Sequence, residues 1–183
     1  MHLSPTIRRL IALAVTLVSV MTMVALGAPA NAASGSVDAT CTGGLMSFAA
    51  SPGLLLTNQQ NSVTGASTAA STCVGGPTGT GSATLKNAAA SGLIGCVTQS
   101  SVVGSTKVKW ADGTTSGLAV TELIPGVAVS AAMTLKATVT VGRFLGDNVT
   151  IVLAIPLFNP VQCLTAPGVQ SGTGVPTFTF TQP

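Results

Sequence analysis

Charged and aromatic side chains are scarce in this chain. Of its 183 residues, 6% are charged and 3% are aromatic, and tyrosine is absent. The single histidine, His2, lies at the start, so the remainder has no imidazole to act as a base near neutral pH. This argues against Ser–His–Asp and Cys–His catalytic centres. No SxxK motif is present to offer a Ser–Lys pair instead.

Carboxylates are also too few to favour catalysis by an acid–base pair. The four acidic residues are Asp38, Asp112, Glu122 and Asp147. Asp112 lies in a predicted turn, and we expect Glu122 to face Lys107 or Lys109 across neighbouring strands. A glycosidase needs two carboxylates across a cleft, and the D-x-[DN]-x-[DN]-G calcium loop is missing. We therefore predict that the protein is not an enzyme and uses no cofactor and no metal.

The first residues have the features of an export signal. Arg8 and Arg9 precede an uncharged, mostly apolar run over residues 10–27, and Ala30-Asn31-Ala32 is a small-x-small cleavage site. We predict that residues 1–32 are a signal peptide that is removed. A retained membrane anchor is the alternative, because the run approaches the roughly 20 residues that span a bilayer. No basic cluster follows the run, and this favours cleavage.

Export leaves residues 33–183 as a single domain with little net charge. Loss of Arg8 and Arg9 lowers the formal charge of +3 by two units, and the remaining Lys and Arg form no patch for nucleic acid. No later apolar run is long enough to span a membrane. We expect a secreted, extracellular protein whose partner is a cell-envelope component or another secreted protein, with no nucleic-acid partner and no membrane contact after signal removal.

Four cysteines remain in the exported part of the chain. An even number of cysteines in a secreted protein predicts two disulfides. A zinc site is the alternative, but the spacings are wide, no CxxC occurs and no histidine is available. Three pairings are possible, and we favour Cys41–Cys73 with Cys96–Cys163.

The clearest structural pattern is an apolar/polar alternation over residues 129–141, with the apolar residues at the odd positions. A period of two is typical of a strand with one buried and one solvated face. Residues 149–155 repeat it. Asp112-Gly113 between two strand-like runs predicts a hairpin turn. The Ser-, Thr-, Ala- and Gly-rich part is harder to read, and we expect strands there near 62–73 and 80–88.

These signals predict an all-β chain of about eight or nine strands at short spacing. Such a pattern is typical of a sandwich or a barrel. Half-buried antiparallel strands suit two packed sheets. We predict a single antiparallel β-sandwich, immunoglobulin-like or jelly-roll-like, with two disulfides.

Several short motifs occur in series along the predicted domain. They are Cys41-Thr42-Gly43-Gly44, Ser51-Pro52-Gly53-Leu54, Trp110-Ala111-Asp112-Gly113-Thr114, Gly142-Arg143-Phe144-Leu145-Gly146-Asp147 and Cys163-Leu164-Thr165. In this series the chain resembles small secreted β-sandwich proteins of actinobacteria. The resemblance implies export, two disulfides and a sandwich, and it implies no particular activity.

Trp110 is the only tryptophan and has two interpretations. It either fills the core or offers a platform on which a sugar ring stacks. The preferred function is a non-enzymatic protein that acts by surface contact. The alternatives are a carbohydrate- or small-ligand-binding module centred on Trp110, and a secreted protease or hydrolase inhibitor that uses a loop near a disulfide, such as residues 156–170.

Overall fold

The computed structural model describes residues 35–75, 81–126, 131–156 and 159–183. The predicted signal peptide and its cleavage site lie outside these residues, as do Val129 and Ser130 of the alternating segment. In the described part of the chain, no helix is both long and apolar enough to cross a membrane.

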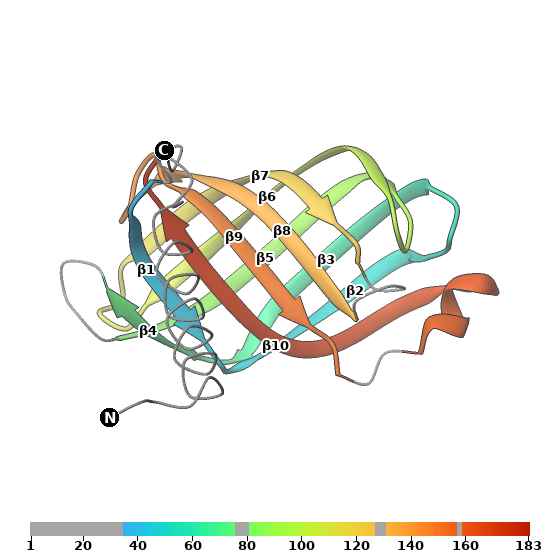
Figure 1. Cartoon of the computed structure of the whole chain (residues 1–183), viewed down its shortest axis with the longest axis horizontal. Coiled ribbons are helices and arrows are strands. Elements are labelled where there is room, and N and C mark those ends of the chain that lie inside the picture. Colours follow the sequence, from blue (N-terminus) through green and yellow to red (C-terminus); the bar gives the residue numbers. More distant parts are fainter. Residues whose placement is uncertain (1–34, 76–80, 127–130, 157–158) are drawn as a thin grey trace, which may run out of the picture. The chain divides into compact units, whose positions relative to one another are not determined.

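The described residues form ten strands and one short 3₁₀ helix (Figure 1). The elements are β1 (Val37–Thr42), β2 (Leu45–Leu54), β3 (Gln59–Ala69), β4 (Ser71–Gly75), β5 (Gly81–Ile94), β6 (Gln99–Trp110), β7 (Thr115–Ile124), β8 (Ala132–Val141), β9 (Asn148–Ala154), η1 (Pro160–Leu164) and β10 (Val169–Thr181). The all-β prediction is confirmed. The expected strand over 62–73 is two strands, β3 and β4, with Ala70 between them.

All ten strands belong to one antiparallel sheet that closes on itself. From β5 the sheet runs through β6, β7, β8 and β9 to β10. Two routes lead from β10 back to β5. On the first route, the first half of β10 pairs with β2, β2 pairs with β3, and β3 pairs with β5. On the second route, the second half of β10 pairs with β1, β1 pairs with β4, and β4 pairs with β5. The opposite walls of this sheet therefore face each other across one core, as the two layers of a sandwich do. The two walls belong to one continuous ten-stranded sheet.

The predicted face alternation is confirmed in β8 and β9. Met133, Leu135, Ala137 and Val139 are buried in β8, while Lys136 between them is exposed. In β9 the odd positions are buried in the same way. Because successive side chains of a strand point to opposite faces, the odd positions 133–139 of β8 and 149–153 of β9 line the core, whereas Val141 at the end of β8 is 62% exposed, contrary to the prediction.

Both predicted disulfides are confirmed. Cys41 and Cys73 are direct partners in the pairing of β1 with β4, and their Cα atoms are 3.9 Å apart. Cys96 follows β5 and bonds to Cys163 of η1, with the Cα atoms 6.1 Å apart. The second bridge thus ties the β5–β6 turn to a segment that precedes β10.

Candidate functional site

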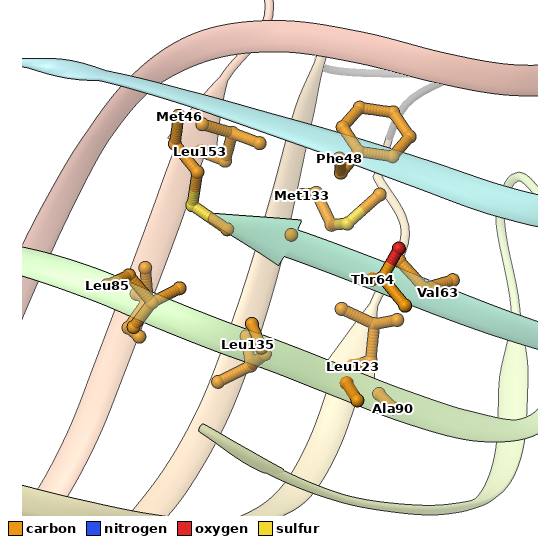
Figure 2. A pocket seen from close by; sticks show the side chains of 14 residues that line it. Met46, Phe48, Val63, Thr64, Leu85, Ala90, Leu123, Met133, Leu135 and Leu153 are labelled. Atoms are coloured by element: carbon orange, nitrogen blue, oxygen red, sulfur yellow. The ribbon is translucent and has the colours of Figure 1, made fainter. Parts of the chain in front are cut away.

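A small apolar cavity lies inside the closed sheet (Figure 2). Its volume is about 30 Å³, and Met46 and Met133 contribute flexible side chains to its wall. The other large side chains around it are Phe48, Val63, Leu85, Leu123, Leu135, Ile151 and Leu153. An engineered apolar cavity that binds benzene measures roughly 150 Å³. The core of this protein therefore holds no preformed ligand site of that size.

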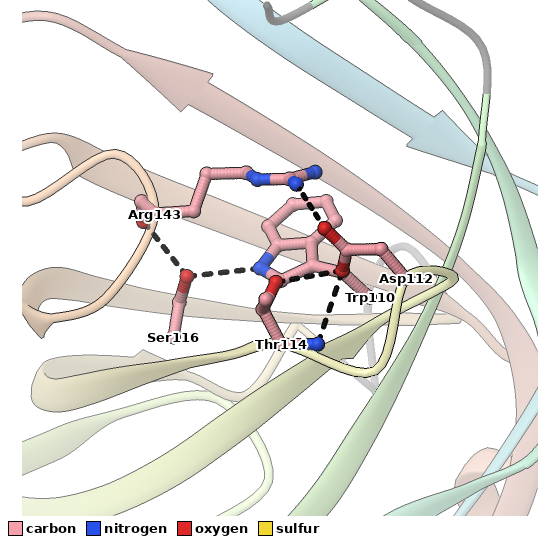
Figure 3. Close-up of polar contacts among 5 residues, drawn as sticks. All are labelled: Trp110, Asp112, Thr114, Ser116 and Arg143. Atoms are coloured by element: carbon pink, nitrogen blue, oxygen red, sulfur yellow. Dashed lines mark hydrogen bonds and ion pairs between the residues drawn. The ribbon is translucent and has the colours of Figure 1, made fainter. Parts of the chain in front are cut away.

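Trp110 is a core residue at the opposite end of β6 from the Cys96 turn. Its side chain is 5% exposed. The indole Nε1–H donates to Ser116 Oγ at 2.9 Å, and Ser116 Oγ–H donates to the Arg143 carbonyl at 2.7 Å (Figure 3). A buried indole N–H needs such a partner, and β7 and the β8–β9 turn supply it.

Neighbouring side chains cover the ring of Trp110. The ring centroids of Phe144 and Phe180 lie 5.5 Å and 5.3 Å away, and the Arg143 guanidinium lies 5.2 Å from the centroid. Trp110 therefore offers little of its ring for sugar stacking, although its edge lines a recess of about 160 Å³ together with Asp112, Arg143 and Phe144. Its burial follows from the alternation of β6, where Lys107 and Lys109 are exposed.

Asp112 stabilises the predicted hairpin turn and binds Arg143. Thr114 donates its N–H and its hydroxyl to Asp112 Oδ1 at 3.0 Å and 2.7 Å, and Arg143 Nη2 lies 2.6 Å from Asp112 Oδ2. These bonds from Thr114, and then the Arg143 charge, hold the pKa of Asp112 below its usual value. Gly113 has φ +84, which a glycine adopts without strain. The hairpin is confirmed, and Asp112 has a structural role in it.

Glu122 does not face the predicted lysines. Its carboxylate lies 2.8 Å from Lys136 Nζ, and the two residues are direct partners in the pairing of β7 with β8. The pairing of β7 with β6 places Lys107 opposite Gly117 instead. Glu122 therefore forms an exposed cross-strand ion pair on the outer face.

The structure brings Asp38 and Asp147 together, although they lie far apart in the sequence. Asp38 is in β1, and Asp147 directly precedes β9. Burial of Asp147, together with the charge of Asp38 and a hydrogen bond between the two side chains, raises the pKa of Asp147. Asp147 is 4% exposed. Sequence reasoning missed this pair, because only the adjacency of β1, β10 and β9 in the sheet creates it.

Four exposed apolar residues lie on the segments that the Cys96–Cys163 disulfide and adjacent backbone hydrogen bonds join, and we call them the apolar tip: Leu56, Val97, Val161 and Leu164. Their exposed fractions are 42%, 39%, 57% and 63%. The disulfide holds the segments of Val97 and Leu164 together. The Leu56 N–H donates to the Cys163 carbonyl at 2.9 Å, which adds the β2–β3 turn. Sequence reasoning had singled out only the 156–170 part of this surface.

The surroundings of the apolar tip are polar but uncharged. Thr98 donates to Asn58 Oδ1 at 2.6 Å between the two turns, and Asn159 caps η1 by accepting from the Val161 N–H at 3.0 Å. No Asp, Glu, Lys or Arg occurs in residues 54–58, 95–98 or 159–168. The tip can therefore form apolar contacts and neutral hydrogen bonds, and it has no group suited to acid–base chemistry.

Comparison of the chain with protein-family models, with curated proteins and with solved structures finds no match. Within the described ranges, no three His, Cys, Asp or Glu side chains come together as ligands for a metal ion. Function must therefore be inferred from the surfaces themselves.

Proposed function

We propose that the protein is an exported, disulfide-stabilised and non-enzymatic domain that acts by surface contact, of the kind that the resemblance to secreted actinobacterial proteins implies. In this proposal the apolar tip binds an uncharged surface of another secreted or envelope protein. All four cysteines are paired, and disulfides of this kind persist in oxidising, extracellular environments.

The observation that carries the proposal is the exposure of the apolar tip. Large apolar side chains from three separate segments gather at one place, where a disulfide and backbone hydrogen bonds hold them. Large apolar residues that remain exposed on neighbouring segments are typical of an interaction site. The hydrophobic centre, the rim of amides and hydroxyls and the lack of charge correspond to the anatomy of a protein–protein interface.

The carboxylates support the non-enzymatic part of the proposal. Asp112 and Glu122 are each held in an ion pair with a neighbouring cation. Asp147 is 4% exposed, so a substrate would not reach it. No histidine lies beyond His2 to act as a base.

The geometry favours surface contact over the two alternative functions. A ligand-binding module centred on Trp110 would have to use the recess of about 160 Å³ that Trp110 lines with Asp112 and Arg143, because the faces of the ring are covered and the core cavity measures only about 30 Å³. A protease inhibitor presents an extended loop that resembles a substrate, whereas residues 160–164 form the helix η1. The exposed side chains of η1 are then better suited to a docking surface than to insertion into a protease.

Site-specific photo-cross-linking in the producing cells tests the proposal. A photoreactive residue is placed at position 97 or 164 of the tip, and the control is position 103 of β6. Val103 is 65% exposed but lies outside the tip. We expect both tip positions, and not position 103, to yield a cross-link to the same protein.

A second variant links the cross-link to the tip itself. Leu164→Asp should weaken cross-linking from position 97 by about tenfold or more, because an apolar anchor at the centre of an interface contributes strongly. Its thermal midpoint should stay near that of the wild type, since Leu164 is 63% exposed. Equal cross-linking from all three positions, or sedimentation of the protein with lipid vesicles in place of a protein partner, would contradict the proposal.

A further inference from the structure

A buried carboxylate without a hydrogen-bond donor lies at the start of β9. Asp147 is 4% exposed, and among the described residues its Oδ2 atom has no hydrogen-bond partner. Its backbone is fixed on both sides, because its N–H donates to the Phe144 carbonyl at 3.0 Å and its carbonyl accepts from Val139 at 2.9 Å. A buried, unsatisfied carboxylate oxygen is costly, so a ligand or a proton is expected to satisfy it.

Asp38 and Gln182 lie at the same end of the sheet as Asp147. Val37 of β1 and Asn148 of β9 both pair with Thr181 of β10, so the neighbouring Asp38 and Asp147 flank the same end of that strand. The Gln182 amide Nε2–H donates to both carboxylate oxygens of Asp38, at 3.0 Å and 3.3 Å. Gln182 is held in turn by its N–H, which donates to the Ser36 carbonyl at 3.0 Å.

No positive side chain in the described structure neutralises this group of oxygens. Asp38 is the only charged residue that shifts the pKa of Asp147, and it shifts it upward. Arg143, the nearest basic residue along the chain, has its guanidinium on Asp112 and over Trp110. Two carboxylates therefore flank one end of β10, and the buried one has an oxygen without a partner, which favours a bound cation.

We propose that Asp38 and Asp147 bind a calcium ion, with the side-chain carbonyl of Gln182 as a further ligand. Calcium accepts carboxylate and amide oxygens in irregular arrangements and completes its shell with water. Calcium binding would turn the Gln182 amide by half a turn, so that Oε1 replaces the Nε2 donor that faces Asp38 in the free protein. Zinc is disfavoured, since no histidine or free thiol is near.

The proposed ion would join three parts of the chain. Asp38 belongs to β1, Asp147 begins the β9 segment, and Gln182 follows β10, which pairs with both β1 and β9. Calcium would thus fasten the first and last strands to the β8–β9 turn. The site is independent of the apolar tip, and it lies near the Trp110–Phe144 contact because Asp147 bonds to the Phe144 backbone.

Terbium luminescence tests the site directly. Terbium replaces calcium at oxygen sites and emits when a nearby tryptophan is excited, and Trp110 is the only tryptophan in the chain. We expect sensitised terbium emission from the full exported domain, displaced by calcium at about 10⁻⁴–10⁻³ M, the range of extracellular calcium modules. Asp147→Asn and Asp38→Asn should each lower the terbium affinity at least tenfold, whereas Asp112→Asn should leave it unchanged.

Thermal melting gives an independent measurement. Calcium at ten times its Kd should raise the midpoint of the wild type by about 3–6 °C and leave that of Asp147→Asn unchanged. If Asp147→Asn does not fold, the partly exposed Asp38 provides the same comparison. Absence of sensitised emission, or equal calcium effects in all variants, would overturn the proposal and show that a proton alone satisfies Asp147.

Discussion

The buried hydroxyl of Ser116 offers the sharpest test of how the Trp110 end is held. Ser116 is fully buried, accepts from the indole N–H at 2.9 Å and donates to the Arg143 carbonyl at 2.7 Å. Ser116→Ala removes both bonds and leaves a buried donor without a partner. Each buried group left unsatisfied costs about 1–3 kcal/mol. Because the carbonyl is partly accessible, we expect a total loss of about 2 kcal/mol in the free energy of unfolding.

Urea unfolding followed by the fluorescence of Trp110 measures this loss, and it should lower the thermal midpoint by about 4–8 °C. Ser105→Ala is the matched control. Ser105 lies on the neighbouring strand β6 and is exposed, so its removal should change stability by less than about 0.5 kcal/mol.

A double-mutant cycle separates the hydrogen bond from the packing of the indole. Trp110→Phe removes the donor and part of the ring, and Ser116→Ala removes the acceptor. If the bond stabilises the fold, the double variant should be about 1 kcal/mol more stable than the sum of the two single losses predicts. Circular dichroism replaces fluorescence for all three variants here, because Trp110→Phe and the double variant lack the tryptophan. Strict additivity, or a Ser116→Ala variant as stable as the wild type, would refute the reasoning.

Three further predictions concern charge and disulfides. The raised pKa of Asp147 means that the folded state binds the proton of this carboxyl more tightly than the unfolded state does. Without calcium, the stability of the wild type relative to Asp147→Asn should therefore fall as the pH rises above about 3.8. Thermal melts of both proteins across this pH range check the prediction, and parallel stability profiles would contradict it. Glu122→Gln should cost less than about 1 kcal/mol in urea unfolding, since its ion pair with Lys136 is partly exposed to solvent. Replacing Cys96 and Cys163 with Ser should cost about 2–5 kcal/mol and expose the tip segments to proteolysis, and an unchanged digestion pattern would show that hydrogen bonds alone hold them.

Local signals in the sequence were sufficient to predict the strands in which apolar and polar residues alternate strongly. In β8 and β9 the pleat has a period of two, so a one-sided core selects apolar residues at every second position. The β6–β7 turn was equally accessible, because Gly113 adopts a positive φ that few residues tolerate. These features depend on neighbouring residues only, which is why the sequence alone predicts them.

The small-residue strands were harder to predict for a physical reason. β3 and β4 consist mainly of Ser, Thr, Ala and Gly, whose side chains differ little in hydrophobicity, so the inner and outer faces leave a weak pattern. The break between β3 and β4 at Ala70, and the pairing of β5 with both β3 and β6, depend on contacts between residues that are distant in the sequence. The same is true of the partner of Glu122, because register decides which neighbouring strand supplies the lysine.

The candidate site residues also divide into those that local sequence could predict and those that depend on strand pairing. The burial of Trp110 could be foreseen only as one of two interpretations, since a lone aromatic suits a core and a binding face equally well in the sequence. The contact between Asp38 and Asp147 left no sequence signal, because it arises from the order of β1, β10 and β9 in the sheet. The apolar tip likewise joins three separate segments through one disulfide and two backbone hydrogen bonds.

The distribution of charge connects the fold to the proposed mode of contact. Residues 39–85 and 148–183 contain no charged side chain, and they supply the β2–β3 turn and η1, which form most of the apolar tip. An uncharged surface produces no long-range field to steer a charged partner. Association through the tip should then proceed at the ordinary rates of neutral proteins and depend little on salt. Because apolar contacts strengthen rather than weaken in salts such as sulfate, the effect of salt distinguishes binding through the tip from binding through the Arg143–Asp112 end of the molecule.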